Sequence, residues 1–137
     1  MLVSDVMLHL DAFPVMDKSI IFKECLEVMG KFGLGVGCIV DDSNKLLGIF
    51  TDGDLRRKLL KIQRPISSLF IDDALQHSIL LPLTIESNVH IESAVLLMEN
   101  NKVWDLPVVD SDGILKGLLH LHPAIKALLN SSNSPTL

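Results

Sequence analysis

Apolar and polar residues follow two different spacings along the chain. Between positions 20 and 33, apolar residues recur every three or four positions, as on one face of a helix: Ile21, Cys25, Val28, Met29 and Phe32. Two short apolar runs follow at 36–40 and 46–50, on either side of the polar segment 41–45. Such runs around a cluster of Asp, Ser and Asn are typical of a β-hairpin. The pattern therefore predicts a helix followed by a hairpin.

Two further elements complete this unit. Residues 13–15 form a short extended segment ahead of the helix, and residues 52–61 form a second helix after the hairpin. On the second helix, Leu55, Leu59 and Ile62 lie at positions i, i+4 and i+7, so we expect all three to be buried. The predicted order is strand, helix, strand, strand, helix.

This order occurs twice in the chain. Residues 19–59 align with residues 88–128 at an offset of 69 positions without a gap, and six of the 41 aligned pairs are identical. The shared apolar pattern is a stronger signal than this identity. We therefore predict one repeat at residues 1–62, a second repeat at residues 63–130 and a flexible tail at residues 131–137.

The second repeat contains its own version of each element. An extended segment is expected at 81–83, a hairpin over 106–109 and 114–119, and a closing helix over 123–129. The first helix of this repeat carries a matching apolar stripe: Ile91, Ala94, Val95 and Met98. At 68 residues, each copy is short for an independent domain, so we expect the two copies to share one core.

Composition narrows the class of protein. The chain has 137 residues, of which 48% are hydrophobic and 21% charged, which excludes intrinsic disorder and favours a surface that a second subunit covers. A net charge of −5 argues against nucleic-acid binding. No apolar stretch reaches membrane-spanning length, and Asp5 and Asp11 interrupt any signal peptide. Cys25 and Cys38 are expected as buried, reduced thiols in the cytoplasm, with a disulfide as the alternative.

Candidate chemistry gathers after the first hairpin. Thr51 stands where a strand ends and a helix begins, and Asp54 follows three positions later. These two residues form a capping box in one interpretation. In the other, the helix N-terminus and Thr51 hold a phosphate while Asp54 accepts ribose hydroxyls. Five of the twelve basic residues lie at 56–64, and Arg57, Lys61 and Arg64 are expected on one helical face. Arg56 and Arg57 therefore either contact an anion or form a solvated face.

The duplicated order and its motifs resemble a CBS domain pair, the regulatory repeat of the cystathionine β-synthase family. The resemblance rests on Asp-Val-Met at 5–7, Val-Asp at 40–41 and the string GIFTDGDLRR at 48–57, and it covers residues 3 to about 129. That string, together with GLLHLH at 117–122, is similar to the C-terminal regulatory half of D-arabinose-5-phosphate isomerases of the KpsF/GutQ type.

The resemblance implies an α+β fold of tandem repeats packed as a pseudo-twofold pair, called a Bateman module, and a homodimer of such modules. It implies a phosphate at Thr51 and a ribose at Asp54. The other ligand-binding residues that it implies surround the base or border these two: Leu34, Gly35, Val36, Ile49 and Gly53.

The second repeat departs from this pattern. His120 replaces Thr51, and Pro123 replaces Asp54 and brings no carboxylate. We expect no ordinary ribose-phosphate site here. Trp104, Asp105 and His120 are left to line a cleft for a different ligand, or the Trp104 ring fills the position of the base. We also expect the final helix to begin at Pro123.

These observations favour a regulatory module that senses a nucleotide or nucleotide-sugar. By resemblance it would control an arabinose-5-phosphate isomerase domain outside this chain, in the synthesis of the lipopolysaccharide sugar Kdo, with AMP, ADP, ATP or CMP-Kdo as ligand. We identify no catalytic residues, no metal site and no required cofactor, and expect neither nucleic acid nor membrane as a partner. The alternative function is a structural dimerisation module without a ligand.

Overall fold

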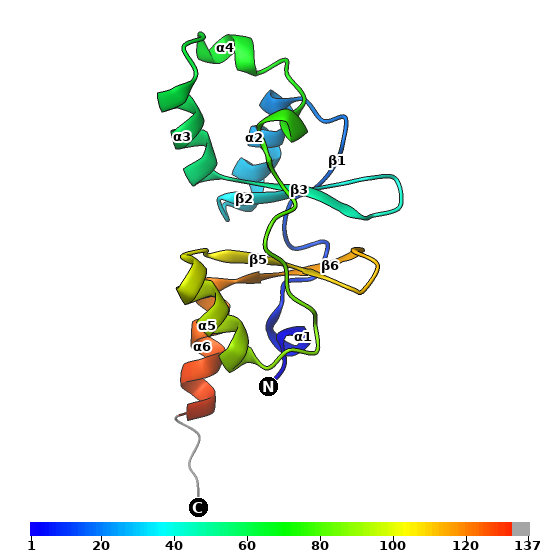
Figure 1. Ribbon diagram of the computed structural model, residues 1–137, viewed down its shortest axis with the longest axis vertical. Coiled ribbons are helices and arrows are strands. Elements are labelled where there is room, and N and C mark those ends of the chain that lie inside the picture. The colour runs from blue at the N-terminus through cyan, green and yellow to red at the C-terminus, as the bar shows by residue number, and fades with distance from the viewer. Residues whose placement is uncertain (133–137) are drawn as a thin grey trace, which may run out of the picture. The chain divides into compact units, whose positions relative to one another are not determined.

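The chain folds into two compact units that are each built around a β-hairpin. The computed structural model describes residues 1–132, with side chains to residue 130 (Figure 1). One unit, here called the N-repeat unit, is Leu10–Pro82. The other, the C-repeat unit, combines Met1–His9 with the chain from Leu83 onward.

The N-repeat unit contains the predicted hairpin and both predicted helices. Its four-stranded sheet has the order β1-β2-β3-β4, with β1 parallel to β2 and the other neighbours antiparallel. Its elements in chain order are β1 (Val15–Asp17), α2 (Phe22–Phe32), β2 (Val36–Val40), β3 (Leu46–Thr51), α3 (Asp52–Lys61), α4 (Ile66–Leu69), the 3-10 helix η1 (Ala74–His77) and β4 (Ile79–Leu80).

The core of this unit lies between α2 and the sheet. Phe22 of α2 meets Phe50 of β3 edge to face, with ring centroids 5.1 Å apart, and Cys25 and Met29 are buried beside them. The predicted stripes were wrong at two positions, because Phe32 is 40% and Leu59 is 45% exposed. Phe32 ends its helix, and Leu59 lies on the outer side of α3, which packs inward through other apolar residues.

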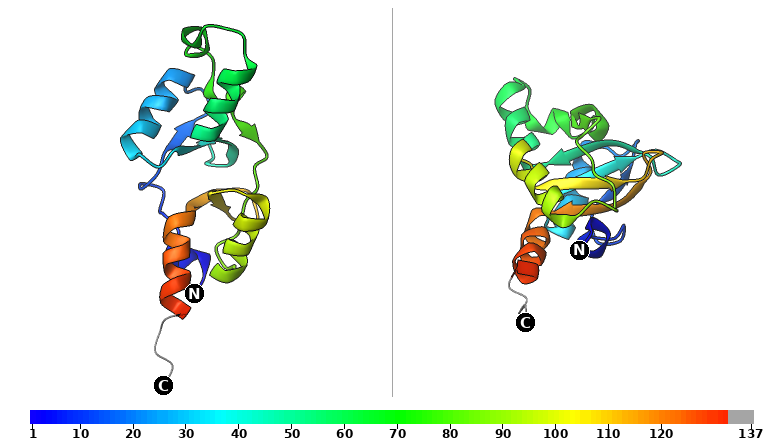
Figure 2. Two further views of the ribbon diagram at one scale, coloured as in Figure 1. Left: turned by 90° about the vertical axis from the view of Figure 1, so that its left-hand side faces the viewer. Right: turned by 60° about the horizontal axis from the view of Figure 1, so that its bottom comes forward.

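The C-repeat unit repeats the helix and hairpin arrangement. Its elements are α1 (Val3–Val6), α5 (Ile91–Asn101), β5 (Asp105–Val109), β6 (Leu115–His120) and α6 (Leu121–Ser132). Helices α5 and α6 lie side by side on one face of the β5–β6 hairpin (Figures 1 and 2). Ile91, Ala94 and Met98 of the predicted stripe are fully buried against this hairpin.

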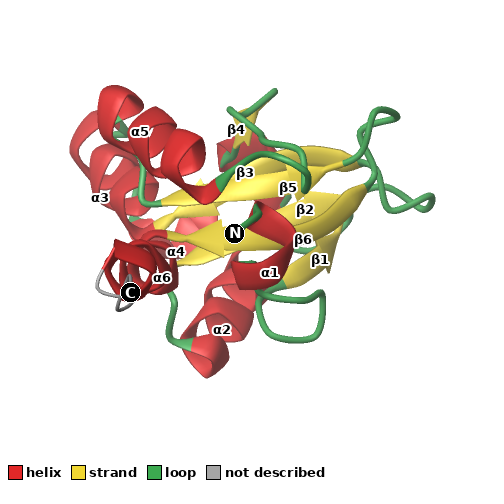
Figure 3. Cartoon of the chain, turned by 90° about the horizontal axis from the view of Figure 1, so that it is seen from below, coloured by secondary structure: helices red, strands yellow, loops and turns green. Residues whose placement is uncertain are grey.

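The start of the chain packs with the later repeat. Leu8 forms a backbone bridge with Leu118 of β6, and Val3 N–H donates to the carbonyl of Val89 at 2.9 Å. Figure 3 shows α1 beside β6. Gly117 permits this approach, because a Cβ there would lie 2.7 Å from the carbonyl oxygen of Leu8. In the N-repeat unit, β4 occupies the corresponding edge of β3. Each hairpin thus pairs with a segment that falls within the other predicted repeat, so the compact units do not divide at the predicted boundary of 62 and 63.

The last helix is longer than predicted at both ends. It begins at Leu121 rather than at Pro123 and continues to Ser132. Pro123 is its third residue, and a proline is tolerated there because N–H groups in the first turn have no partner within the helix. Residues 131 and 132 of the predicted tail are therefore helical, and 133–137 lie outside the described residues.

Two further sequence predictions are tested by the fold. Cys25 and Cys38 are both buried, and neither forms a disulfide. Burial raises the pKa of the Cys25 thiol to about 11. Over residues 1–132, no helix is both long enough and apolar enough to cross a membrane.

Candidate functional site

The junction between β3 and α3 is closed by a reciprocal pair of hydrogen bonds. Thr51 is the N-cap residue in an extended conformation, and its Oγ1 accepts from the backbone N–H of Asp54 at 3.2 Å. Asp54 Oδ2 in turn accepts from the backbone N–H and from the hydroxyl of Thr51, both at 2.9 Å. The capping-box interpretation is confirmed by these contacts.

The second carboxylate oxygen of Asp54 faces an arginine. Arg57 Nη2 donates to Asp54 Oδ1 at 2.7 Å, within an ion pair whose arginine side chain is 56% exposed while the aspartate side chain is 7% exposed. The arginine crosses the first turn of α3, since a Cβ built on Gly53 would lie 3.3 Å from its guanidinium. A buried carboxylate with one oxygen held by Thr51 and the other by an exposed cation can exchange the second partner.

Gly35 brings a bare backbone segment to the same junction. Its carbonyl accepts from the N–H of Asp52 at 2.9 Å, which fixes the loop before β2 against the start of α3. Its φ is +73°, and a Cβ there would lie 2.8 Å from Asp52 Oδ2. The positive φ favours glycine here, whereas the contact is with the end of the exposed Asp52 side chain, which can rotate away. Asp52 is a residue of this site that the sequence analysis did not single out.

The other predicted base-pocket residues are adjacent in the sheet. Val36 is the register partner of Thr51, and Ile49 lies two positions before Thr51 on the same strand. Val36 and Ile49 are 0% and 6% exposed, so a ligand here would meet mainly their backbone. Leu34 is half-buried at the start of this segment. The structure thus gathers the residues predicted around Thr51 at one edge of the N-repeat unit.

The basic face predicted on α3 does not extend to Arg64. Arg57 is paired with Asp54, and Arg56 is exposed. Arg64 was expected on one helical face with Arg57 and Lys61, but α3 ends at Lys61. Arg64 instead donates to Asp72 at 2.6 Å.

That aspartate is the centre of a polar network that sequence reasoning missed. His77 Nε2 lies 2.8 Å from the same Asp72 oxygen, and the ring of His77, which is 5% exposed, packs against Phe22. Hydrogen bonds from His77 and Arg64 lower the pKa of Asp72. The network ties η1 to the segment after α3, and no motif in the sequence indicated it.

The corresponding junction in the C-repeat unit keeps the backbone but changes the side chains. Leu121 N–H donates to the carbonyl of Trp104 at 2.8 Å, as Asp52 does to Gly35. Asp105 and His120 are register partners across the hairpin, and His120 Nδ1 lies 2.6 Å from Asp105 Oδ1. Burial raises the pKa of Asp105, although its contact with His120 acts in the opposite direction. The structure therefore brings together two of the three residues predicted for the second cleft.

The third, Trp104, is 70% exposed and lines a groove beside α6. The groove has a volume of about 540 Å³ and includes His120. Its remaining side chains lie along α6: Leu121, His122, Ile125, Lys126, Leu129 and Asn130. The spacing of 122, 125, 126 and 129 marks one helical face, a signal that was present in the sequence but was not used.

Comparison with known proteins agrees with this arrangement. A model of the CBS domain matches residues 3–61 and 81–129. The CBS-pair protein CBSX2 from Arabidopsis thaliana has a TM-score of 0.82 at 26% identity, and covers 98% of each chain. A crystal structure of CBSX2 in complex with AMP has a TM-score of 0.83 at 26% identity, covering 96% of this chain and 98% of that chain.

Curated relatives are much longer proteins. An uncharacterised protein of Chlamydia pneumoniae is 40% identical over 105 residues, which are 74% of this chain and 31% of that protein. Arabinose 5-phosphate isomerase KdsD of Pseudomonas aeruginosa is 36% identical over 72% of this chain and 29% of its own length. Inosine-5'-monophosphate dehydrogenase of Aquifex aeolicus is 30% identical over 76% of this chain and 20% of its own length. The chain thus spans about a third of the curated relatives that it matches first.

Proposed function

Because this chain belongs to the CBS domain family, we propose that it is a regulatory module that binds an adenine nucleotide at the junction between β3 and α3. The observation that carries the proposal is the buried Asp54 carboxylate, held at the first turn of α3 opposite the bare backbone of Gly35. The similarity to a structure in complex with AMP supports adenine as the base.

The contacts of Asp54 indicate how a nucleotide would enter. Thr51 holds Oδ2 through the backbone, so this oxygen keeps its place. Arg57 holds Oδ1 from an exposed position, so the ribose hydroxyls would take over Oδ1 and release the guanidinium. The released arginine and the positive end of the α3 helix dipole would then face the phosphate. Binding would thereby change the surface of α3, and a regulated partner domain could respond to this change if it contacts α3.

Calorimetric titration with AMP tests this proposal directly. We expect saturable binding to the wild-type chain and at least tenfold weaker binding to Asp54→Asn, because a hydrogen bond to a charged group contributes about 1.5–3 kcal/mol. Asp5→Asn is the matched control: Asp5 also caps a helix, with Oδ2 accepting from Leu2 N–H at 2.8 Å, but in the other unit. Equal affinity in wild type and Asp54→Asn would reject the site.

A structural dimerisation module is the second candidate. It is favoured by the complete set of partners that Thr51 and Arg57 already provide for Asp54, which makes the cap self-sufficient. It is also favoured by large exposed apolar side chains on α3, with Leu60 82% exposed. This candidate predicts a dimer by light scattering and no thermal stabilisation by AMP, ADP, ATP, CMP or CMP-Kdo. A ligand present at 100 times its dissociation constant would raise the free energy of unfolding by about 2.7 kcal/mol, a change that thermal unfolding detects readily.

The regulated partner is proposed to be an arabinose-5-phosphate isomerase domain in Kdo synthesis. This proposal is supported by the similarity to KdsD of Pseudomonas aeruginosa, although the matched region is less than a third of that enzyme. The match to inosine-5'-monophosphate dehydrogenase indicates that similar regions also occur in enzymes of another class. We place the module in the cytoplasm, in keeping with two cysteines that form no disulfide. Stabilisation by CMP-Kdo well beyond CMP would support the Kdo assignment, and stabilisation by AMP alone would reject it.

A further inference from the structure

We propose that Asp52 determines the base specificity of the junction between β3 and α3, because its carboxylate accepts a hydrogen bond from the amino group of a bound adenine. Asp52 is the first residue of α3, and it is exposed. This role rests on the proposed function, since it requires a nucleotide at Thr51 and Asp54. It goes further by assigning recognition of the base edge to one side chain.

The Asp52 carboxylate lies beside the segment where the base is expected. A Cβ built on Gly35 would be 2.8 Å from Asp52 Oδ2 and 3.3 Å from Asp52 Cγ, so the side chain lies along the bare backbone of Gly35. The hydrogen bond from Asp52 N–H to the Gly35 carbonyl, at 2.9 Å, holds the two backbones together. Gly35 is the middle residue of the predicted base segment, between Leu34 and Val36. A base on this segment would therefore have the carboxylate within reach.

This carboxylate has no competing partner. Within residues 1–132, the Asp52 side chain forms neither a hydrogen bond nor an ion pair. By contrast, Asp54 has one oxygen held by Thr51 and the other by Arg57. The helix dipole alone favours an aspartate at the start of a helix. What distinguishes Asp52 is a carboxylate beside the base segment with both oxygens unengaged.

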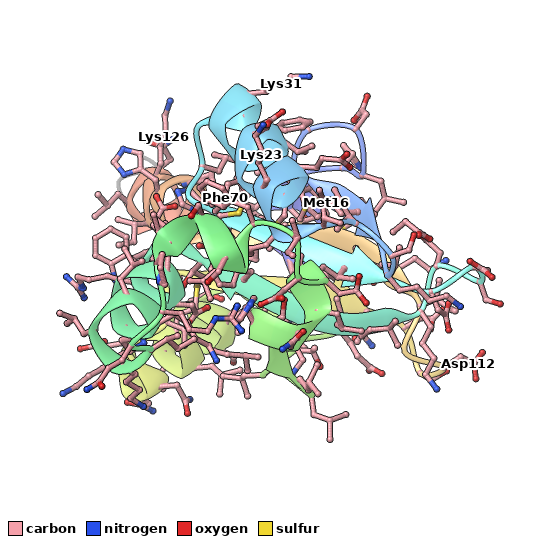
Figure 4. All side chains as sticks on the ribbon, turned by 90° about the horizontal axis from the view of Figure 1, so that it is seen from above. Met16, Lys23, Lys31, Phe70, Asp112 and Lys126 are labelled. Carbon is pink, nitrogen blue, oxygen red and sulfur yellow. The ribbon has the colours of Figure 1, made fainter. Side chains whose placement is uncertain are left out.

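The neighbouring basic side chains do not neutralise Asp52. Arg56 lies one turn further along α3, and it forms no ion pair with Asp52 in the described part of the chain. Lys31 is in the last turn of α2, ahead of the Gly35 loop, and it is exposed. Figure 4 shows the Lys31 side chain reaching away from the ribbon. The carboxylate is therefore available as a charged acceptor.

A carboxylate only accepts hydrogen bonds, so it selects a base with an N–H donor at the edge that it faces. The exocyclic amino group of adenine is such a donor, and a hydrogen bond to a charged acceptor is stronger than one between neutral groups. Because the exposed Asp52 side chain can rotate, it can make room for the ring and then accept from the amino group. A purine without this group presents a C–H there and leaves the acceptor unpaired.

Calorimetric titration with two nucleotides tests this role. AMP and purine riboside 5′-monophosphate share the ribose and the phosphate, and they differ only in the amino group of the base. We expect AMP to bind the wild-type chain about tenfold more tightly, near the lower end for a hydrogen bond to a charged group, because the acceptor is exposed. In Asp52→Ala, the ratio of the two affinities is expected to fall to about one.

Two variants separate this role from others. Asp54→Asn is expected to weaken both nucleotides by the same factor and to keep their ratio, because its carboxylate serves the ribose. Asp42→Asn is the matched control. Asp42 is also an exposed aspartate of the N-repeat unit, but it lies between β2 and β3, at the opposite end of β3 from Thr51. Its replacement is expected to change neither affinity.

The outcomes distinguish the role of Asp52 from the proposed function. Equal affinities of the wild-type chain for AMP and purine riboside 5′-monophosphate would overturn the role of Asp52 and leave the nucleotide site standing. A ratio that persists in Asp52→Ala would also overturn it, because another group must then recognise the amino group. If neither nucleotide binds the wild-type chain saturably, the nucleotide site and the role of Asp52 both fall.

Discussion

Removing either half of the Thr51–Asp54 capping box tests whether this junction is one cooperative unit. Asp54→Ala removes the two hydrogen bonds that Oδ2 accepts from Thr51 and the ion pair with Arg57, but it leaves the N-cap bond from the N–H of residue 54 to Thr51 Oγ1. Each of the two lost hydrogen bonds contributes about 0.5–1.5 kcal/mol, and the exposed ion pair contributes less than about 1 kcal/mol. We expect a total loss of about 2 kcal/mol in the free energy of unfolding.

Thr51→Ala removes contacts of the same box from the other side. It eliminates the oxygen that accepts from Asp54 N–H and the hydroxyl that donates to Asp54 Oδ2. Because the two residues share these hydrogen bonds, the double variant is expected to lose about 1 kcal/mol less than the sum of the single losses. Arg57→Ala serves as the control, since it removes only an exposed partner and is expected to lose at most about 1 kcal/mol.

Urea unfolding followed by circular dichroism provides the free energies, and thermal unfolding provides a second readout. For a chain of this length, a loss of 2 kcal/mol corresponds to a decrease of roughly 6–10 °C in Tm. The reasoning would be refuted if the effects of Thr51→Ala and Asp54→Ala added within about 0.3 kcal/mol. It would also fail if Arg57→Ala were as destabilising as Asp54→Ala, because the carboxylate would then depend on its exposed partner and not on the cap.

Three further predictions concern titratable groups. The pKa of about 11 at Cys25 predicts no reaction of this thiol with Ellman's reagent at pH 8 within an hour in the native state, and rapid reaction in guanidinium chloride; fast native labelling would contradict its burial. Hydrogen bonds from His77 and Arg64 lower the pKa of Asp72 below its ordinary value of 3.8, so its stabilising contribution is present above 3.8 and is lost as the pH falls through the folded-state pKa. The deficit of Asp72→Asn in urea unfolding should therefore shrink between pH 5 and pH 3, and a constant deficit would argue against the network. Burial raises the pKa of Asp105, so ionisation of this group lowers the stability of the fold as the pH rises through that pKa. Asp105→Asn is therefore expected to keep the wild-type Tm at pH 7. An equal loss of Tm in Asp105→Asn and Asp105→Ala would show instead that the charge itself is needed.

The sequence predicted the two hairpins and the helices that flank them because each carried a local signal, whereas α1, α4, η1 and β4 were not predicted. The run 36–40 was predicted as a strand and is β2, and the 52–61 helix is α3, which begins at a capping residue. Helix ends without such a signal were less accurate. Pro123 was expected to begin the last helix, but a proline fits anywhere in the first turn, so it did not mark the start.

Side-chain partners that depend on the third dimension were not predictable. Arg64 was placed on a helical face with Arg57 by extending the α3 periodicity past Lys61, whereas its partner, Asp72, comes from a later turn. The pairing of Leu8 with Leu118 likewise joins residues at opposite ends of the chain, and no periodicity encodes it. The wrong placement of Arg64 and the missed Leu8–Leu118 pairing have one cause. Local residue spacing predicts a helix or strand, but it does not predict which other segment packs against it.

The two junctions show what the duplication preserves and what it leaves free to change. In both, an N–H at the start of the closing helix donates to the carbonyl that precedes the hairpin, from Asp52 to Gly35 and from Leu121 to Trp104, at nearly equal distances of 2.9 and 2.8 Å. This bond needs no particular side chain, so the backbone frame survives when Gly35 is matched by a tryptophan. In the N-repeat unit the frame carries a carboxylate at the helix start, and in the C-repeat unit it carries an indole beside basic side chains. The duplication thus preserves the backbone frame of the junction, while the side chains around it differ in charge and shape between the two units.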